Sequence, residues 1–198
     1  MSAAPAPPLV LASTSPQRRA ILEQLGIPFQ VVAPSFDEER NGERSDHAAI
    51  AERNARGKAR SVQPQAGERP VLGVDTTVVS GARSFGKPAN AEEAAEMLET
   101  LSGETHSVVS GLCLLTPGWE VVEHDVTRVA FRAVTARDIA AYVASGEWQG
   151  RAGGYAIQGL GAALVARIEG DYLNVVGLPA ALLVRLLSER FAGVYGFG

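Results

Sequence analysis

The sequence predicts an α/β fold, because segments with the pattern of buried strands alternate with segments that carry helix starts and helical spacing of apolar residues. The chain has 198 residues, of which 46% are hydrophobic and 20% charged, so it can bury the core that one domain needs. Its formal net charge is −4, and we therefore expect neither nucleic acid nor an anionic membrane as a partner. Any site for an anionic ligand must be local.

The first half of the chain carries the signals of several strands and two helices. Ser15 followed by Pro16 predicts a capped helix start, and Gly26 ends that helix. A stripe of small residues at helical spacing, from Ala48 to Val62, predicts a second helix that packs closely on its neighbour. Strands are expected over residues 9–13, 28–33, 71–81 and 85–87, and helices over residues 16–25 and 46–62.

The second half continues the alternation of strands and helices. Asn90 and Glu93 form the pattern of a capping box at a helix start, and Thr135 caps a further helix. Two long β-rich segments flank Pro117 and Gly118, which predicts a hairpin. The expected elements are helices over residues 91–101, 135–144 and 178–191, and strands over residues 105–115, 121–131 and 164–170.

The N-terminal segment and the single cysteine favour a cytoplasmic protein. We expect residues 1–8, rich in alanine and proline, to be disordered before one domain over residues 9–198. Residues 1–8 lack the basic start and the apolar stretch of a secretory signal. Cys113 lies in an apolar run and has no second cysteine for an internal disulfide, which favours a reducing compartment.

The segment STSPQRR, residues 13–19, lies where a strand passes into a helix. Free backbone N–H groups at a helix start bind anions, and the hydroxyls of Ser13 and Ser15 add donors. Arg18 and Arg19 lie in the first turn, where cations oppose the helix dipole unless an anion compensates. We interpret the segment as a phosphate-binding site. An ordinary capped helix with two solvated arginines is the alternative.

Asp75 lies inside the apolar run VLGVDTTVV. An ionised carboxylate there is costly unless a cation, a metal ion or hydrogen bonds meet it, so the position indicates a functional site. A strand-end aspartate that caps a turn is the structural alternative. Asp37, Glu38 or Glu39 could supply a second carboxylate for a hard divalent ion, although a solvated acidic loop explains these residues equally well.

Two lysines are candidates for the same site. Lys58 follows the small-residue stripe at helical spacing and could reach from its edge into a cleft. Lys87 precedes Pro88, which favours an extended backbone and fixes its direction. A surface position explains either lysine by itself. The histidines show no paired metal-ligand spacing, and we expect structural or surface roles for them: His47, His106 and His124.

In their order and spacing, these segments resemble the Maf family of nucleoside triphosphate pyrophosphatases. The matching stretches are LASTSPQRRAILEQLGIPF, ERNARGKA, VLGVDTTVV, GKPANAEEAAEMLETLSGETHSVVSG and AGGYAIQGLGAALVARIEGDYLNVVGLP. The resemblance implies an elongated mixed sheet with flanking helices, in two lobes around a deep cleft, and often a homodimer. It also implies hydrolysis of a nucleoside triphosphate to the monophosphate and pyrophosphate with Mg²⁺ or Mn²⁺.

The resemblance also implies roles for individual residues. Asp75 corresponds to the general base of the family, and Glu38 to a loop carboxylate that would hold the metal together with Asp75. The positions that correspond to phosphate-handling residues are Ser13, Ser15, Arg18, Arg19, Lys58 and Lys87.

Three positions bear on the base of the substrate. Within the family, the group that prefers dTTP and UTP has SPRR, GADT and IQG, and the 7-methyl-GTP group has SPWR, SDQ and SEG. Thr76 and Gln158 match the first group, whereas Gln17 matches neither. The resemblance therefore implies a dTTP/UTP-type or modified substrate, in a house-cleaning role with a possible link to cell-division arrest. Val74 and Arg151 also depart from the family pattern, which commonly has Ala or Ser and Lys there.

Two other functions compete with this one. A nucleotide sensor or protein-binding regulator of septum formation would need the cations but not the carboxylate of Asp75, which weakens anion affinity. Hydrolysis of another pyrophosphate-linked metabolite would differ only in what the base pocket accepts.

Overall fold

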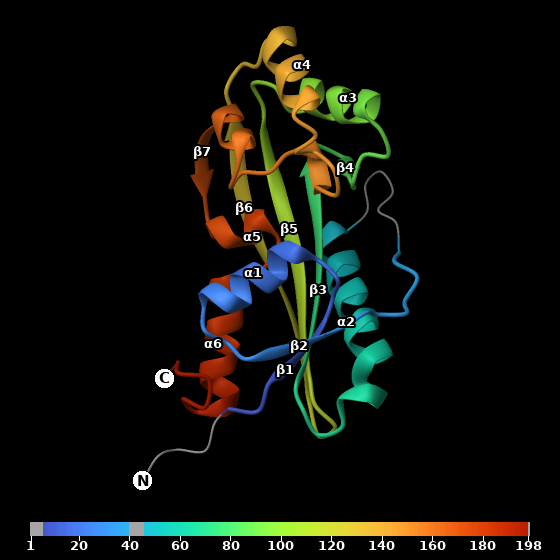
Figure 1. Cartoon of the computed structure of the whole chain (residues 1–198), viewed down its shortest axis with the longest axis vertical. Helices are drawn as coiled ribbons and strands as arrows, with labels where there is room; N and C mark the ends of the chain where they lie inside the picture. Colours follow the sequence, from blue (N-terminus) through green and yellow to red (C-terminus); the bar gives the residue numbers. More distant parts are fainter. Residues whose placement is uncertain (1–5, 40–45, 198) are drawn as a thin grey trace.

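The computed structural model describes residues 6–39 and 46–197, which form an elongated molecule around one mixed sheet (Figure 1). Over these residues seven strands pair in the order β2-β1-β3-β5-β6-β7, with β4 also on β3. The predicted α/β class with flanking helices is thus confirmed. The strands are β1 (Leu9–Ala12), β2 (Phe29–Val32), β3 (Val71–Ser80), β4 (Arg83–Phe85), β5 (Thr105–Leu115), β6 (Glu120–Phe131) and β7 (Val165–Glu169).

The strand directions place the end of one strand beside the middle of another. β1 is parallel to β2 and β3, whereas the β3–β5, β5–β6 and β6–β7 pairs are antiparallel. Ala12, the last residue of β1, pairs with Gly73, and β3 continues beyond this point to Ser80. The turn that follows β1 therefore lies next to residues 74–76 of β3.

Helices cover both faces of the sheet (Figure 1). On one face α2 packs against β3 and β5, and on the other α1 and α6 enclose a core with the apolar side chains of β1 and β3. A separate core lies beneath α3 and α4 at the far end of the long strands, so the cores divide the molecule into two lobes. The helices are α1 (Pro16–Gln24), α2 (His47–Ala66), α3 (Ala91–Leu101), α4 (Ala136–Ala144), α5 (Tyr172–Val176) and α6 (Ala180–Phe191).

The predicted small-residue stripe seats α2 directly on the sheet. A Cβ atom added to Gly73 would lie 2.1 Å from the carbonyl oxygen of Ala55, and one on Gly111 would lie 2.2 Å from the backbone of Ala51. Glycines in the strands and alanines in the helix thus allow the two backbones to approach closely. This approach brings polar side chains on the edge of α2 within reach of β3.

The structure differs from the sequence prediction in a few local elements. α2 continues to Ala66, beyond the expected end at residue 62, and so contains Pro64, whose missing N–H removes one hydrogen bond of the helix. The short helix α5 was not predicted, since five residues carry too little periodicity to detect. Glu93 accepts a hydrogen bond from the N–H of Ala89 and not from that of the cap residue, so the predicted capping box is incomplete.

The predicted disordered lead lies mostly outside the described residues, as do residues 40–45 of the polar loop before α2. Ala6 packs against the core that α1 and α6 enclose, and the hydroxyl of Tyr195 donates a hydrogen bond to the carbonyl of Pro7 at 2.8 Å. No helix in the described ranges combines the length and the apolar character that crossing a membrane requires.

Candidate active site

A cavity of about 470 Å³ lies where the two lobes meet. Its walls come from the β1–α1 turn, the middle of β3, the edge of α2, the segment after β4 and the glycine-rich segment 149–158. The structure brings to this cavity all the predicted site residues except Arg19: Ser13, Ser15, Gln17, Arg18, Glu38, Lys58, Asp75, Thr76, Lys87 and Gln158.

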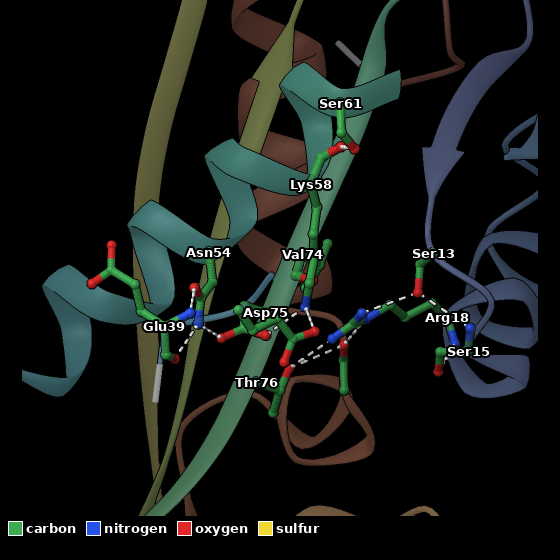
Figure 2. A network of polar contacts seen from close by, with 12 residues as sticks. Ser13, Ser15, Arg18, Glu39, Asn54, Lys58, Ser61, Val74, Asp75 and Thr76 are labelled. Carbon is green, nitrogen blue, oxygen red and sulfur yellow. Dashed lines mark hydrogen bonds and ion pairs between the residues drawn. The ribbon is translucent and has the colours of Figure 1, made fainter. Parts of the chain in front are cut away.

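Asp75 is the buried carboxylate of this cavity, with 7% of its surface exposed. Its Oδ1 accepts a hydrogen bond from Nζ of Lys58 at 2.6 Å, and its Oδ2 accepts one from Nδ2 of Asn54 at 3.0 Å. Figure 2 shows both donors reaching from α2 to the strand. Because β3 continues to Ser80, Asp75 lies within the strand and does not cap its end. The two donors meet the condition for keeping a charge in such a position.

Lys58 links two carboxylates. Its Nζ lies 2.6 Å from Asp75 and 2.7 Å from Oε1 of Glu38, and it also donates to the carbonyl of Val74 at 3.4 Å. The side chain of Lys58 is 7% exposed, whereas that of Glu38 is 56% exposed. Lys58 therefore points inward from the packed face of α2, and Glu38 approaches it from the solvent side.

Arg18 also points into the cavity. Its Nε donates to the carbonyl of Gly177 at 2.9 Å, Nη1 to Oγ of Ser13 at 3.1 Å and Nη2 to Oγ1 of Thr76 at 3.3 Å (Figure 2). Burial lowers the pKa of Arg18 from its ordinary value, and the charges of Asp75 and Glu38 act in the opposite direction. A solvated arginine on an ordinary helix cap does not describe this side chain.

Arg19 lies elsewhere. It is exposed and does not line the cavity, although the sequence analysis groups it with Arg18. The reason is geometric, because successive side chains on a helix point about 100° apart. Arg19 is turned by this angle away from the cavity, whereas Gln17, on the other side of Arg18, lines it.

Two further cations form the opposite wall. Lys87 is exposed but lines the cavity, and so does Arg151 of the glycine-rich segment. The segments that carry them are joined, since the N–H of Gly153 donates to the carbonyl of Gly86 at 3.0 Å. Nε of Arg151 is buried, and no hydrogen-bond partner for it exists among residues 6–39 and 46–197. This wall therefore offers donors that an anionic ligand could use.

The residues predicted to read a base do not all lie together in the structure. Oε1 of Gln17 accepts a hydrogen bond from Oγ of Ser15 at 2.9 Å, and Gln158 is exposed. Both glutamines also line an adjoining apolar hollow of about 350 Å³ between α1 and α5. Oγ1 of Thr76 instead lies 2.9 Å from Oγ of Ser110 and accepts from Arg18, so Thr76 supports the arginine.

The sequence analysis missed several members of the site. Asn54 lies one helical turn before Lys58 in the stretch ERNARGK, and this spacing could have indicated it. The carbonyl of Gly177 and the hydroxyl of Ser110 carry no local signal, because only the fold brings them to Arg18 and Thr76. Arg151 was noted only as a departure from a family pattern.

The carboxylates can be tested as ligands of a hard divalent ion. Asp75 and Glu38 both approach the same Nζ atom, so their oxygens converge on one point of the cavity. Within the described ranges no group of three or more His, Cys, Asp or Glu side chains could hold a metal ion. The two carboxylates of Asp75 and Glu38 nevertheless fit Mg²⁺ or Mn²⁺, which commonly bind one or two protein carboxylates together with substrate phosphates.

Comparison with known proteins identifies the family of this chain. The family model described as Maf-like protein matches residues 8–190. The chain belongs to the Maf family. The dTTP/UTP pyrophosphatase of Deinococcus radiodurans is 43% identical over 198 residues, which cover all of both chains. The dTTP/UTP pyrophosphatase of Gloeobacter violaceus is 49% identical over 182 residues, which cover 91% of this chain and 95% of the relative.

Solved structures give a weaker similarity than these Maf relatives. The Ham1 protein of Staphylococcus aureus aligns with 63% of this chain and 72% of its own, with a TM-score of 0.44 and 15% identity. The assignment to the Maf family therefore depends on the sequence comparisons.

Proposed function

We propose that this Maf family member hydrolyses nucleoside triphosphates to the monophosphate and pyrophosphate. The observation that carries the proposal is the buried carboxylate of Asp75 in a cavity whose other charged groups are mostly cations. A cavity built only to bind a triphosphate gains nothing from this carboxylate, which repels the ligand. The names of the relatives with 43% and 49% identity support the same activity.

In the proposed reaction a water molecule attacks the α-phosphorus. Asp75 orients this water and accepts its proton, a bond forms between the water oxygen and phosphorus, and the bond from the α-phosphorus to the bridging oxygen breaks. Pyrophosphate leaves with the electron pair of that bond. Most of the catalysis comes from positioning and charge stabilisation, as is usual for phosphoryl transfer.

The cations divide between two walls of the cavity. Arg18 is held by three hydrogen bonds and so presents its guanidinium in one orientation. Lys87 and Arg151 on the other wall are suited to bind the outer phosphates and stabilise the charge of departing pyrophosphate. Lys58 keeps the carboxylates of Asp75 and Glu38 close together before substrate enters.

A divalent cation, Mg²⁺ or Mn²⁺, belongs to this proposal. Asp75 and Glu38 would hold it, and it would neutralise charge on the phosphate oxygens. Both carboxylates already contact one cationic group, which supports a shared ligand position.

The proposed substrates are dTTP, UTP or modified nucleotides of this type. Gln17 and Gln158 both line the cavity and the adjoining apolar hollow, and an amide both donates and accepts hydrogen bonds, as reading the edge of a pyrimidine requires. The relatives named dTTP/UTP pyrophosphatase support this preference.

The test is a product analysis. Purified protein is incubated with Mg²⁺ or Mn²⁺ and each of a panel of natural and methylated nucleoside triphosphates, and pyrophosphate is separated from orthophosphate. We expect equal amounts of monophosphate and pyrophosphate, with dTTP and UTP among the best substrates. Release of orthophosphate alone would contradict attack at the α-phosphorus, and tight binding without product over hours would favour the nucleotide sensor.

A further inference from the structure

Asn54 lies at the centre of the polar contacts around Asp75, although no step of the proposed reaction uses it. It is on α2, one turn before Lys58, and only 2% of its surface is exposed. Its side-chain amide makes three hydrogen bonds (Figure 2). A buried amide with this many partners is held in one orientation.

The three hydrogen bonds connect two parts of the site. Oδ1 of Asn54 accepts from the N–H of Glu39 at 2.8 Å, and Nδ2 donates to the carbonyl of Glu39 at 3.0 Å. Nδ2 also donates to Oδ2 of Asp75 at 3.0 Å. The acceptor contact to Glu39 fixes which end of the amide is oxygen, so the nitrogen must face the carboxylate. One side chain therefore connects the acidic loop that carries Glu38 with the strand that carries Asp75.

We propose that Asn54 is a positioning residue that sets the orientation of the Asp75 carboxylate. By engaging Oδ2 it leaves Oδ1 directed toward Lys58 and Glu38, where the proposed reaction needs it. The inference rests on the proposed function, because it assigns Asn54 a role in proton transfer from the attacking water. Without the amide donor, Oδ2 would be buried without a partner, and the carboxylate could rotate to share Lys58 between both oxygens.

This role predicts an effect on turnover and not on substrate affinity. A displacement of a reacting group by about 1 Å can cost about 100-fold in rate, so we expect Asn54→Leu to lower kcat by about 10- to 100-fold. KM and the dissociation constant of a non-hydrolysable triphosphate analogue should change by less than about threefold, since Asn54 is not among the residues that line the cavity. Leucine has the same number and branching of side-chain heavy atoms as asparagine, and the melting temperature checks that the variant folds.

A matched control separates an effect through the Asp75 carboxylate from an effect through the loop that carries Glu39. Arg53, the neighbouring residue on α2, forms an exposed ion pair with the side chain of Glu39 at 2.9 Å. Arg53→Gln releases that side chain and leaves the contacts of Asn54 intact, so we expect kcat within about twofold of wild type, as for most exposed ion pairs. An equal loss in Arg53→Gln and Asn54→Leu would overturn the proposal in favour of a general effect of the loop.

A double-mutant cycle tests whether Asn54 acts through Asp75. If it does, Asn54→Leu should lower kcat by less than about threefold when Asp75→Asn is already present, because the group to be positioned is gone. Equal losses in both backgrounds would overturn the proposal. An active wild type with an equally active Asn54→Leu variant would overturn the role of Asn54 alone. A wild type that releases no pyrophosphate would overturn the proposed function and the role of Asn54 with it.

Discussion

Replacing Asp75 with asparagine changes charge with almost no change in volume. Asp75 accepts hydrogen bonds from Lys58 and from Asn54, so both of its neighbours in the cavity are donors. The new amide has a single acceptor oxygen, and its nitrogen must face one of these donors. Lys58 would retain Glu38 as its remaining carboxylate, at 2.7 Å.

Two effects of Asp75→Asn have opposite signs. A positioned general base contributes about 10²- to 10⁴-fold, so we expect kcat to fall by about 100-fold or more, which is about 2.7 kcal/mol in the activation free energy. With no divalent cation present, removing the negative charge beside Arg18 and Lys58 should at the same time leave the affinity for a polyanion unchanged or stronger. A purely structural defect would weaken both properties together.

The assay for Asp75→Asn is steady-state release of pyrophosphate with Mg²⁺ or Mn²⁺, combined with calorimetric titration of a non-hydrolysable triphosphate analogue in the absence of a divalent cation. The expected pattern is a low kcat with an analogue dissociation constant no higher than that of wild type. An unchanged kcat would remove Asp75 from the mechanism. A raised dissociation constant at unchanged kcat would show that Asp75 helps to bind substrate and does not act on the attacking water.

Other parts of the structure give three further predictions. Arg18→Ala should raise KM for triphosphates more than it raises the inhibition constant of the monophosphate product, and Arg19→Ala should change neither by more than about twofold, because Arg18 lines the cavity and Arg19 does not. Gly73→Ala should lower the free energy of unfolding by about 1–3 kcal/mol, measured by denaturation, since its Cβ would lie 2.1 Å from the Ala55 carbonyl. Burial lowers the pKa of His106 to about 4, below its unfolded value of about 6.5, so stability should fall by about 3 kcal/mol from pH 6.5 to 4. The His106→Gln variant should lose this fall in stability between pH 6.5 and 4. An unchanged fall would refute its attribution to His106.

Much of the fold could be predicted because its signals are local. Ser15, Asn90 and Thr135 cap the helices that the sequence assigns to them, and the hairpin turns where Pro117 and Gly118 predict it. Each of these features depends on residues within one turn or one strand pair. Elements as short as α5 lack such a pattern, because their formation depends on contacts with distant parts of the chain.

The site could be predicted where a charged residue in an apolar segment needs an interacting group. Asp75 in an apolar strand required a cation, a metal ion or hydrogen bonds, and Lys58 supplies a cation from α2. The spacing of Asn54 to Lys58 could indicate that Asn54 lies on the same side of the helix, but its hydrogen bond to Asp75 depends on how the helix packs on the sheet. The register of β1 on β3 is likewise a property of the whole sheet, and it is what places Arg18, just after β1, within reach of Thr76 on β3.

The two arginines in the first turn of α1 show how far an electrostatic argument from sequence extends. A cation at a helix start is unfavourable, and this applies equally to Arg18 and Arg19. In the structure only Arg18 is compensated, by the field of Asp75 and Glu38 and by three acceptors, whereas Arg19 is exposed and water screens its charge. The unfavourable cations thus identify the helix end that can bind an anion, but the direction of each side chain in the folded structure decides that Arg18 and not Arg19 faces the cavity.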